Sequence, residues 1–186
     1  MQKIFLLLFF ICINTTSAGL SDPFYLNDQN RSSIERVGDF FQIALPLGAL
    51  GLTKAYKDRD GKKQFWKSYL SSVGTTYLLK VVVDKERPNG HCCESFPSGH
   101  TTAAFSGAMF IQKRYGSNYG LPSLLLASFV GYSRVYAKKH YWIDVICGAT
   151  IGVLGNIFFT NKKNPVEALF FQDSKGDYRL NLIYSL

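Results

Sequence analysis

Five segments of the chain are dominated by apolar residues, and polar loops separate them. Their lengths are close to, or somewhat below, the roughly 20 residues that a helix needs to cross a bilayer. Glycine, serine and threonine dilute each segment, which is common where helices pack closely in lipid, although a buried helix of a soluble protein tolerates them too. The pattern predicts helices over residues 37–56, 65–83, 99–112, 121–136 and 142–160.

The two ends of the chain differ from this pattern. Near the N-terminus, Lys3 precedes an apolar run over 4–13, and small polar residues follow up to Ala18. This order is typical of a secretory signal, which is either removed or kept as a further span. We therefore expect a signal peptide or signal anchor over 1–18, a helical domain over 19–163 and a C-terminal tail over 164–186. Alternation of apolar and polar residues from 178 onward predicts a short strand in the tail.

Basic residues gather in alternate loops of this pattern. They occur over 57–63, at 113–114 and at 162–163, which share one side of a membrane if the helices alternate in direction. Positively charged loops face the cytoplasm, so we expect the loops 84–97 and 137–141 outside. The sequence predicts an all-α bundle of five or six helices, most of them transmembrane, with the active site at the extracytoplasmic helix ends. A mean hydropathy of only +0.01 keeps a soluble, exported bundle open.

Length and charge narrow the picture only in part. A chain of 186 residues is long enough for one domain, and its formal charge of +8 suits nucleic acid, anionic lipid or phosphate-bearing substrates without choosing among them. The sequence His91-Cys92-Cys93-Glu94 holds residue types that bind metals. Contiguous ligands without a second cluster fit zinc poorly, so we expect no metal site here but a loop with a free or intermolecularly bonded thiol.

Candidate chemistry begins with two clusters in the loop 84–97 and at its borders. Lys80 and Arg87 are seven residues apart and would share one face of a continuing helix. The second cluster, Pro-Ser-Gly-His, places Ser98 and Gly99 where the next helix begins, and the unpaired amides at that end of a helix bind anions. His100 in the same place can deliver a proton to the group that the anion carries.

The third cluster lies around the loop 137–141. His140 and Asp144 are four residues apart, so a helix starting near His140 would bring the carboxylate beneath the imidazole and fix its tautomer. Arg134 needs a turn through 137–139 to come back to the same place. Each cluster alone has a structural explanation, such as a cation at a span end, a capped helix or a structural ion pair. Together they favour a phosphate site.

The three clusters, written Lys-x6-Arg-Pro, Pro-Ser-Gly-His and Ser-Arg-x5-His-x3-Asp over residues 80–144, resemble a known signature. It is that of the type 2 phosphatidic-acid phosphatase and vanadium haloperoxidase superfamily, in its bacterial membrane lipid phosphatase branch. The resemblance implies an acid phosphatase that needs neither a metal nor another cofactor. Five residues would hold the phosphate of the substrate: Lys80, Arg87, Ser98, Gly99 and Arg134.

The resemblance also implies the catalytic roles. His140 would attack phosphorus and form a phosphohistidine, and Asp144 would orient it. His100 would protonate the leaving alkoxide and then activate the water that cleaves the intermediate. Phosphoryl transfer needs mainly positioning and charge stabilisation, which three cations and a helix terminus can supply.

The implied substrate is a phosphate monoester or diphosphate, with lipids favoured, hydrolysed at the cytoplasmic membrane of a bacterium by a site that faces the periplasm or exterior. Nucleic acid is not an expected partner. Prenyl diphosphates, phosphatidate, phosphatidylglycerophosphate and glycolipid phosphates all stay open as substrates. The alternatives are a soluble exported acid phosphatase of the same superfamily, a vanadate-dependent haloperoxidase, and a membrane binding protein without catalysis.

Overall fold

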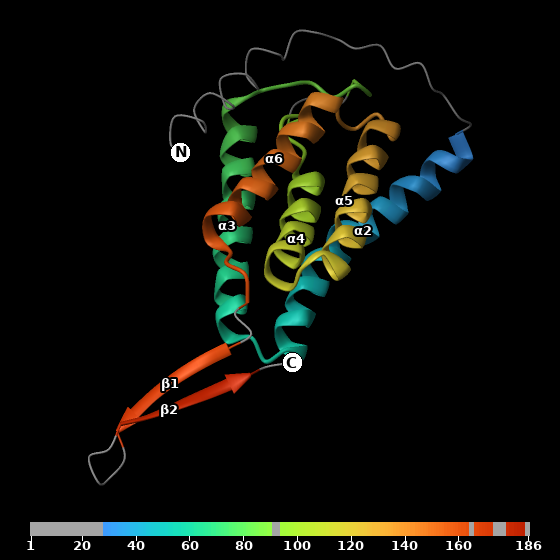
Figure 1. The fold of residues 1–186 in the computed structure, drawn as a ribbon. Coiled ribbons are helices and arrows are strands. Elements are labelled where there is room, and N and C mark those ends of the chain that lie inside the picture. The colour runs from blue at the N-terminus through green and yellow to red at the C-terminus, as the bar shows by residue number, and fades with distance from the viewer. Residues whose placement is uncertain (1–27, 91–93, 164–165, 173–177, 185–186) are drawn as a thin grey trace.

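A computed structural model of the chain describes residues 28–90, 94–163, 166–172 and 178–184. Within them, five helices form a bundle (Figure 1): α2 (Asp28–Ala55), α3 (Arg59–Val82), α4 (Gly99–Tyr115), α5 (Ser117–Tyr136) and α6 (Trp142–Phe159). Each of the five predicted helices is confirmed, and α2, α3 and α5 begin earlier than predicted. The predicted signal segment 1–18 lies outside the described residues.

Helix α4 is the centre of the bundle and packs against α2, α3, α5 and α6. The end of α3, the start of α4, the end of α5 and the start of α6 lie at the same end of the bundle (Figure 1). The loops that follow α3 and α5 therefore meet there, as the alternating pattern of helices predicted. These two loops and the helix ends that border them carry the candidate chemistry.

Small and hydroxyl-bearing residues fill the interior of the bundle. Thr76 of α3 and Thr102 of α4 share a hydrogen bond of 2.9 Å between their hydroxyl oxygens. A Cβ added to Gly107 of α4 would lie 2.7 Å from the backbone nitrogen of Pro46, so α2 and α4 approach as closely as backbones allow. The buried hydroxyl residues of the helices α3 to α5 include Ser68, Ser72, Thr76, Thr101, Thr102, Ser106 and Ser133.

A few large apolar side chains, such as Phe65 and Phe110, are buried in the core, but many others lie on the outside of the bundle. Those more than half exposed are Phe40, Ile43, Leu47, Leu70, Tyr77, Leu78, Val81, Val82, Leu121, Leu125 and Ile146. Among the described helices, α6 is the one long and apolar enough to cross a bilayer by length and composition, with a mean hydropathy of 1.7. For the other described helices the predicted membrane span stays a prediction.

A buried ion pair closes the end of the bundle opposite the candidate chemistry. Asp58, which caps α3 through the amide of Gly61, accepts hydrogen bonds of 2.7 and 2.6 Å from Nε and Nη2 of Arg114. Burial opposes the charge of Asp58, but the hydrogen bonds from Arg114 and Gly61 outweigh it and lower its pKa. The pair fixes the α2–α3 loop to the end of α4.

Two strands follow the bundle and pair in an antiparallel hairpin: β1 (Val166–Gln172) and β2 (Tyr178–Tyr184). The strand predicted in the tail is confirmed as β2, whereas β1 was not predicted. The hairpin extends away from the end of the bundle where α2 meets α3 (Figure 1). The all-α class therefore describes the bundle, and the hairpin is an addition to it.

The close contact at Gly107 gives a test of the packing. We expect Gly107→Ala to lower the melting temperature in detergent, because the new methyl group meets the backbone of α2, at a cost of about 1–3 kcal/mol. Gly74→Ala on α3 is the matched control, since nothing lies within 4 Å of its added Cβ. Replacing a helical glycine there should stabilise by about 1 kcal/mol. Equal shifts for both variants would contradict the packing described.

Candidate active site

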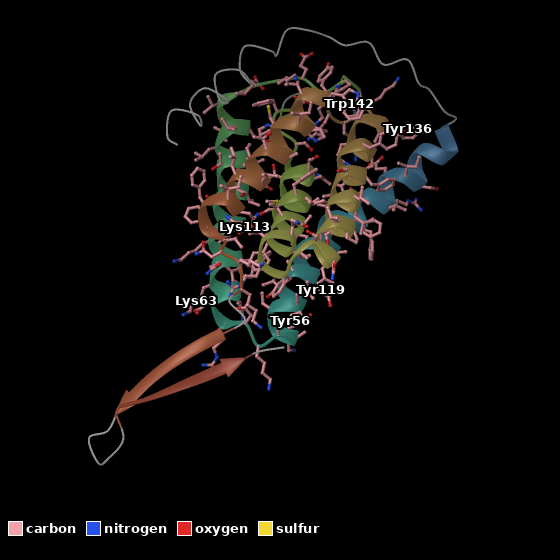
Figure 2. All side chains as sticks on the ribbon, in the orientation of Figure 1. Tyr56, Lys63, Lys113, Tyr119, Tyr136 and Trp142 are labelled. Atoms are coloured by element: carbon pink, nitrogen blue, oxygen red, sulfur yellow. The ribbon has the colours of Figure 1, made fainter. Side chains whose placement is uncertain are left out.

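A cavity of about 300 Å³ opens between α2, α3, α4 and the loops that follow α3 and α5. Tyr136 and Trp142, which are labelled in Figure 2, lie at the same end of the bundle. Of the eight predicted site residues, five line the cavity: Lys80, Arg87, Gly99, His100 and His140. The structure thus brings together residues that are up to 60 positions apart in the chain.

The two cations of the first cluster reach the cavity from different backbone settings. Lys80 lies in the last turn of α3, and its Nζ donates a hydrogen bond to the carbonyl of Glu94. Helix α3 ends at Val82, so Arg87 lies in the loop and not about two helical turns further along a common face. The Nε of Arg87 is buried without a hydrogen-bond partner among the described residues. An anion in the cavity would supply that partner.

His140 is 5% exposed and has a defined tautomer. Its Nδ1 lies 2.6 Å from the carbonyl oxygen of Ser95. A carbonyl only accepts hydrogen bonds, so Nδ1 carries the proton and Nε2 keeps a free lone pair. Burial, followed by the positive charge of Lys80, lowers the pKa of His140 to about 3. A neutral imidazole with an unprotonated Nε2 is the form that can act as a nucleophile.

Asp144 is fully buried but does not hold His140 directly as predicted. Its Oδ2 lies 3.9 Å from Nδ1 of His140, beyond hydrogen-bonding distance, because the Ser95 carbonyl takes the Nδ1 proton. The carboxylate instead accepts hydrogen bonds of 2.7 Å from Lys85 Nζ, 2.6 Å from Ser95 Oγ and 2.9 Å from the amide of Tyr141. Asp144 therefore acts on His140 through Ser95.

Sequence reasoning missed Lys85 and Ser95. Lys85 lies between the two cations of the first motif, and its buried ion pair with Asp144 could not be read from the spacing. Its Nζ also lies 4.5 Å from the ring centroid of Tyr141. Ser95 uses both its hydroxyl and its carbonyl. The second of these contacts comes from the backbone, which leaves no trace in the identity of a residue.

Ser98 and Gly99 start α4, as predicted. Ser98 is fully buried and does not line the cavity: its hydroxyl accepts a hydrogen bond of 2.9 Å from Thr101, and its amide donates one of 2.9 Å to the backbone carbonyl of Asp144. A Cβ added to Gly99 would lie 3.8 Å from Cε of Lys80. The Ser98 side chain thus anchors the helix start, and direct phosphate binding by its hydroxyl stays a prediction.

Arg134 differs from its predicted position in the cavity. The predicted turn through 137–139 is present, with Lys138 at a φ of 54°. The guanidinium, however, is fully buried in the bundle, because residues of α2 that were not predicted to reach this site surround it. Asp39 accepts a hydrogen bond of 2.6 Å from its Nη1, and the carbonyl of Glu35 accepts one of 2.8 Å from its Nη2.

The same carboxylate reaches the second histidine. Oδ1 of Asp39 lies 3.2 Å from Nε2 of His100, and the side chain of Glu35 pairs with Lys139. Glu35 and Asp39 precede the first motif by more than 40 positions, and no spacing rule links them to it. The only signal in the sequence was a charged residue, Asp39, inside an apolar segment.

Among the described residues, no group of three or more His, Cys, Asp or Glu side chains is placed to hold a metal ion. The residues His91, Cys92 and Cys93 of the weak metal motif lie outside the described part of the chain. The cations and amides around the cavity supply positive charge from the protein itself. A reaction without a metal or other cofactor stays a prediction.

Comparison with known proteins identifies the family of this chain. The family model described as "PAP2 superfamily" matches residues 62–165, which include all three motifs and every residue that lines the cavity except Gln42. The chain belongs to the PAP2 superfamily. The resemblance inferred from the motifs is thereby confirmed.

Individual PAP2 relatives are similar over most of this chain. A lipid A 1-phosphatase of Porphyromonas gingivalis is 37% identical over 161 residues, which cover 80% of this chain but only 34% of that protein. A lipid A 4'-phosphatase of Helicobacter pylori is 29% identical over 157 residues, with 78% and 79% covered. The crystal structure of Aquifex aeolicus LpxE matches with a TM-score of 0.53 at 24% identity, over 75% of this chain and 98% of that one. This likeness supports the fold of the bundle.

The PAP2 site makes a prediction about His140 that needs no substrate. We expect its ring to stay neutral, with the proton on Nδ1, as the pH is lowered from about 7 to about 5, because its pKa is lowered to about 3. The unfolded chain takes up this proton near 6.5, so the folded state should lose stability as the pH falls from 6.5 towards 3. Nitrogen-15 NMR of histidine-labelled protein measures both the tautomer and the titration. A His140 ring that titrates near 6.5 would contradict the contacts described.

Proposed function

We propose that the protein is a phosphatase that hydrolyses lipid phosphate esters through a phosphohistidine intermediate on His140. The observation that carries the proposal is the composition of the cavity wall. Two imidazoles, His100 and His140, line the same cavity as Lys80 and Arg87, and the Nε of Arg87 is buried there without a partner among the described residues. A buried N–H group of a cationic side chain is costly without an acceptor, which supports a phosphate group as the occupant.

The first step uses the tautomer of His140. Its free Nε2 attacks phosphorus and forms a P–N bond, while the bond from phosphorus to the ester oxygen breaks. The electron pair of that bond stays on the leaving oxygen, which takes a proton from His100. The positive charges of Lys80 and Arg87 stabilise the oxygens of the transferred phosphoryl group.

The second step reverses the role of His100. Having given up its proton, His100 takes one from a water molecule as that water attacks phosphorus. The P–N bond breaks, its electron pair returns to Nε2 of His140, and inorganic phosphate leaves. One ester and one water are consumed, and one alcohol and one phosphate are formed.

The distribution of polar and apolar side chains supports a location in the membrane. Hydroxyl groups are buried between the helices, while Leu78, Val81 and Leu125 are at least 69% exposed. Soluble proteins rarely expose large contiguous apolar surfaces, whereas lipid-facing helices do. The half-exposed rings of Tyr141 and Trp142 at the cavity end suit the interface between lipid and water. We propose that this end faces the periplasm or exterior.

The relatives support a glycolipid phosphate as the first substrate to test, since two of them are named as lipid A phosphatases. Lipid diphosphates belong in the same test, because an undecaprenyl-diphosphatase of Bacillus subtilis is 31% identical over 96 residues. The narrower prediction of an acid phosphatase stays a prediction, because these relatives are named for lipid substrates. A soluble phosphatase and a membrane binding protein are the alternatives that the following measurements separate.

The nucleophile is tested directly by His140→Ala. We expect release of phosphate from lipid A in EDTA to fall by more than about 1,000-fold, because the covalent intermediate cannot form. Lys63→Ala, an exposed position at the opposite end of the bundle, is the control and should keep full activity. Unchanged release by His140→Ala would refute the mechanism, and loss of wild-type activity in EDTA would show a metal requirement.

The substrate class is tested by comparing dispersed and soluble esters. We expect kcat/KM for a detergent-dispersed lipid phosphate to exceed that for a soluble sugar phosphate by at least about tenfold, since binding of the acyl chains lowers the barrier from free enzyme and substrate. Lipid A, phosphatidate and an undecaprenyl diphosphate form the panel. Equal kcat/KM for lipid and soluble esters would favour the soluble phosphatase alternative.

A further inference from the structure

Helix α2 contributes the carboxylate of Asp39, which contacts two residues of the site. Oδ1 of Asp39 accepts a hydrogen bond of 2.6 Å from Nη1 of Arg134 and lies 3.2 Å from Nε2 of His100. The Asp39 side chain is 43% exposed, whereas Arg134 is fully buried. The buried cation therefore fixes the position of the carboxylate, and the carboxylate fixes one ring nitrogen of His100.

Arg134 has its nitrogens engaged by protein groups. Its Nε donates to Ser133 Oγ at 3.1 Å and its Nη2 to the carbonyl of Glu35 at 2.8 Å, in addition to the contact with Asp39. The guanidinium does not line the cavity. In this arrangement Arg134 anchors α2, and its direct binding of substrate phosphate stays a prediction.

Gly38 shows independently that α2 is seated on this anchor. A Cβ added at this position would lie 2.0 Å from Ser133 Oγ and 2.7 Å from Nη2 of Arg134. The residue before Asp39 must therefore lack a side chain for the two helices to meet. Glycine at position 38 therefore permits the close approach of α2 that places Asp39 beside Arg134 and His100.

The contact defines what each nitrogen of His100 can do. When the ring is neutral, Nε2–H donates to Asp39 and Nδ1 keeps a lone pair. Among the described residues no hydrogen-bond partner contacts that Nδ1, and His100 lines the cavity. Other charged or titratable groups that face His100 are Arg134 of α5 and Lys139 and His140 of the loop that follows it. The same cavity is also lined by Lys80, Arg87 and Glu94. Asp39 is the negative group that counters these charges when His100 is protonated.

We propose that Asp39 is a positioning residue for the acid and base His100, so that Nδ1 of His100 is the atom that exchanges protons with the leaving oxygen and then with water. The proposal rests on the proposed phosphatase function and adds a second carboxylate to it, supplied by a helix that precedes the three motifs. In both steps the proton moves at Nδ1, and Nε2 stays bound to Asp39.

Asp39→Asn tests the proposal on activity. We expect kcat for a lipid phosphate to fall by about 10–100-fold with KM changed less than about threefold, because proton transfer is impaired and phosphate binding is not. The alkaline limb of the kcat/KM profile should move to lower pH, since protonated His100 loses its negative neighbour. Asp39→Glu, which restores a carboxylate, should recover part of kcat.

Glu35→Gln is the matched control on the same face of α2, one helical turn earlier. It removes the same charge and the ion pair with Lys139, but it keeps the backbone carbonyl that holds Arg134. We expect kcat within about threefold of the wild type and an unmoved alkaline limb. A limb shift as large as that of Asp39→Asn would assign the effect to net charge and overturn the proposal.

Histidine nitrogen-15 NMR of the wild-type protein decides the question without catalysis. We expect neutral His100 to carry its proton on Nε2, and a proton on Nδ1 would overturn the proposal even if Asp39→Asn does not fold. An increase of kcat/KM in Asp39→Asn would overturn it too, because Asp39 would then compete with substrate phosphate for Arg134. If His140→Ala keeps wild-type activity, the proposed function fails instead. If His140→Ala is inactive while Asp39→Asn keeps kcat and pH profile, only the role of Asp39 fails.

Discussion

The buried carboxylate of Asp144 is the interaction on which the site depends. A fully buried charge is tolerated only where counter-charge and hydrogen bonds satisfy it. The counter-charge comes from Lys85, and the hydrogen bonds come from Lys85, Ser95 and the amide of Tyr141. Tyr141 follows the other two residues by more than 40 positions in the chain. The carboxylate thereby joins the loop after α3 to the start of α6, and the carbonyl of the same Ser95 orients His140.

Two carboxylates thus serve two histidines in different ways. Asp144 is linked to His140 through hydrogen bonds of Ser95, and burial keeps this imidazole neutral. Asp39 contacts His100 directly and is half-exposed, so a negative charge faces the ring that is proposed to gain and lose a proton. The difference in burial matches the difference in the roles proposed, since a nucleophile needs a free lone pair and an acid needs a proton to give.

The bundle that holds these groups combines small apolar clusters and many polar contacts inside with large apolar side chains exposed outside. Hydroxyls, glycines and alanines let the helices approach to backbone contact, as at Gly107 against Pro46. In lipid, where burial of apolar surface between helices gives little gain, such contacts and hydrogen bonds hold helices together. The ion pair of Asp58 with Arg114 at the far end holds the ends of α2, α3 and α4 in place. A rigid frame is what a reaction that depends on positioning requires.

The sequence by itself determined the five helices, the strand β2 and the family, because apolar periodicity and motif spacing are local properties of the chain. It also placed Lys80, Arg87, Gly99, His100 and His140 around one cavity. Only the tertiary structure decided which partner each group takes. Ser95 lies between Asp144 and His140, and Arg134 donates a hydrogen bond to Asp39 of α2. The partner of a buried charge depends on which groups of distant segments lie close to it and on the cost of desolvating them. Backbone carbonyls can be such partners, and every residue type has one, so the sequence does not reveal them.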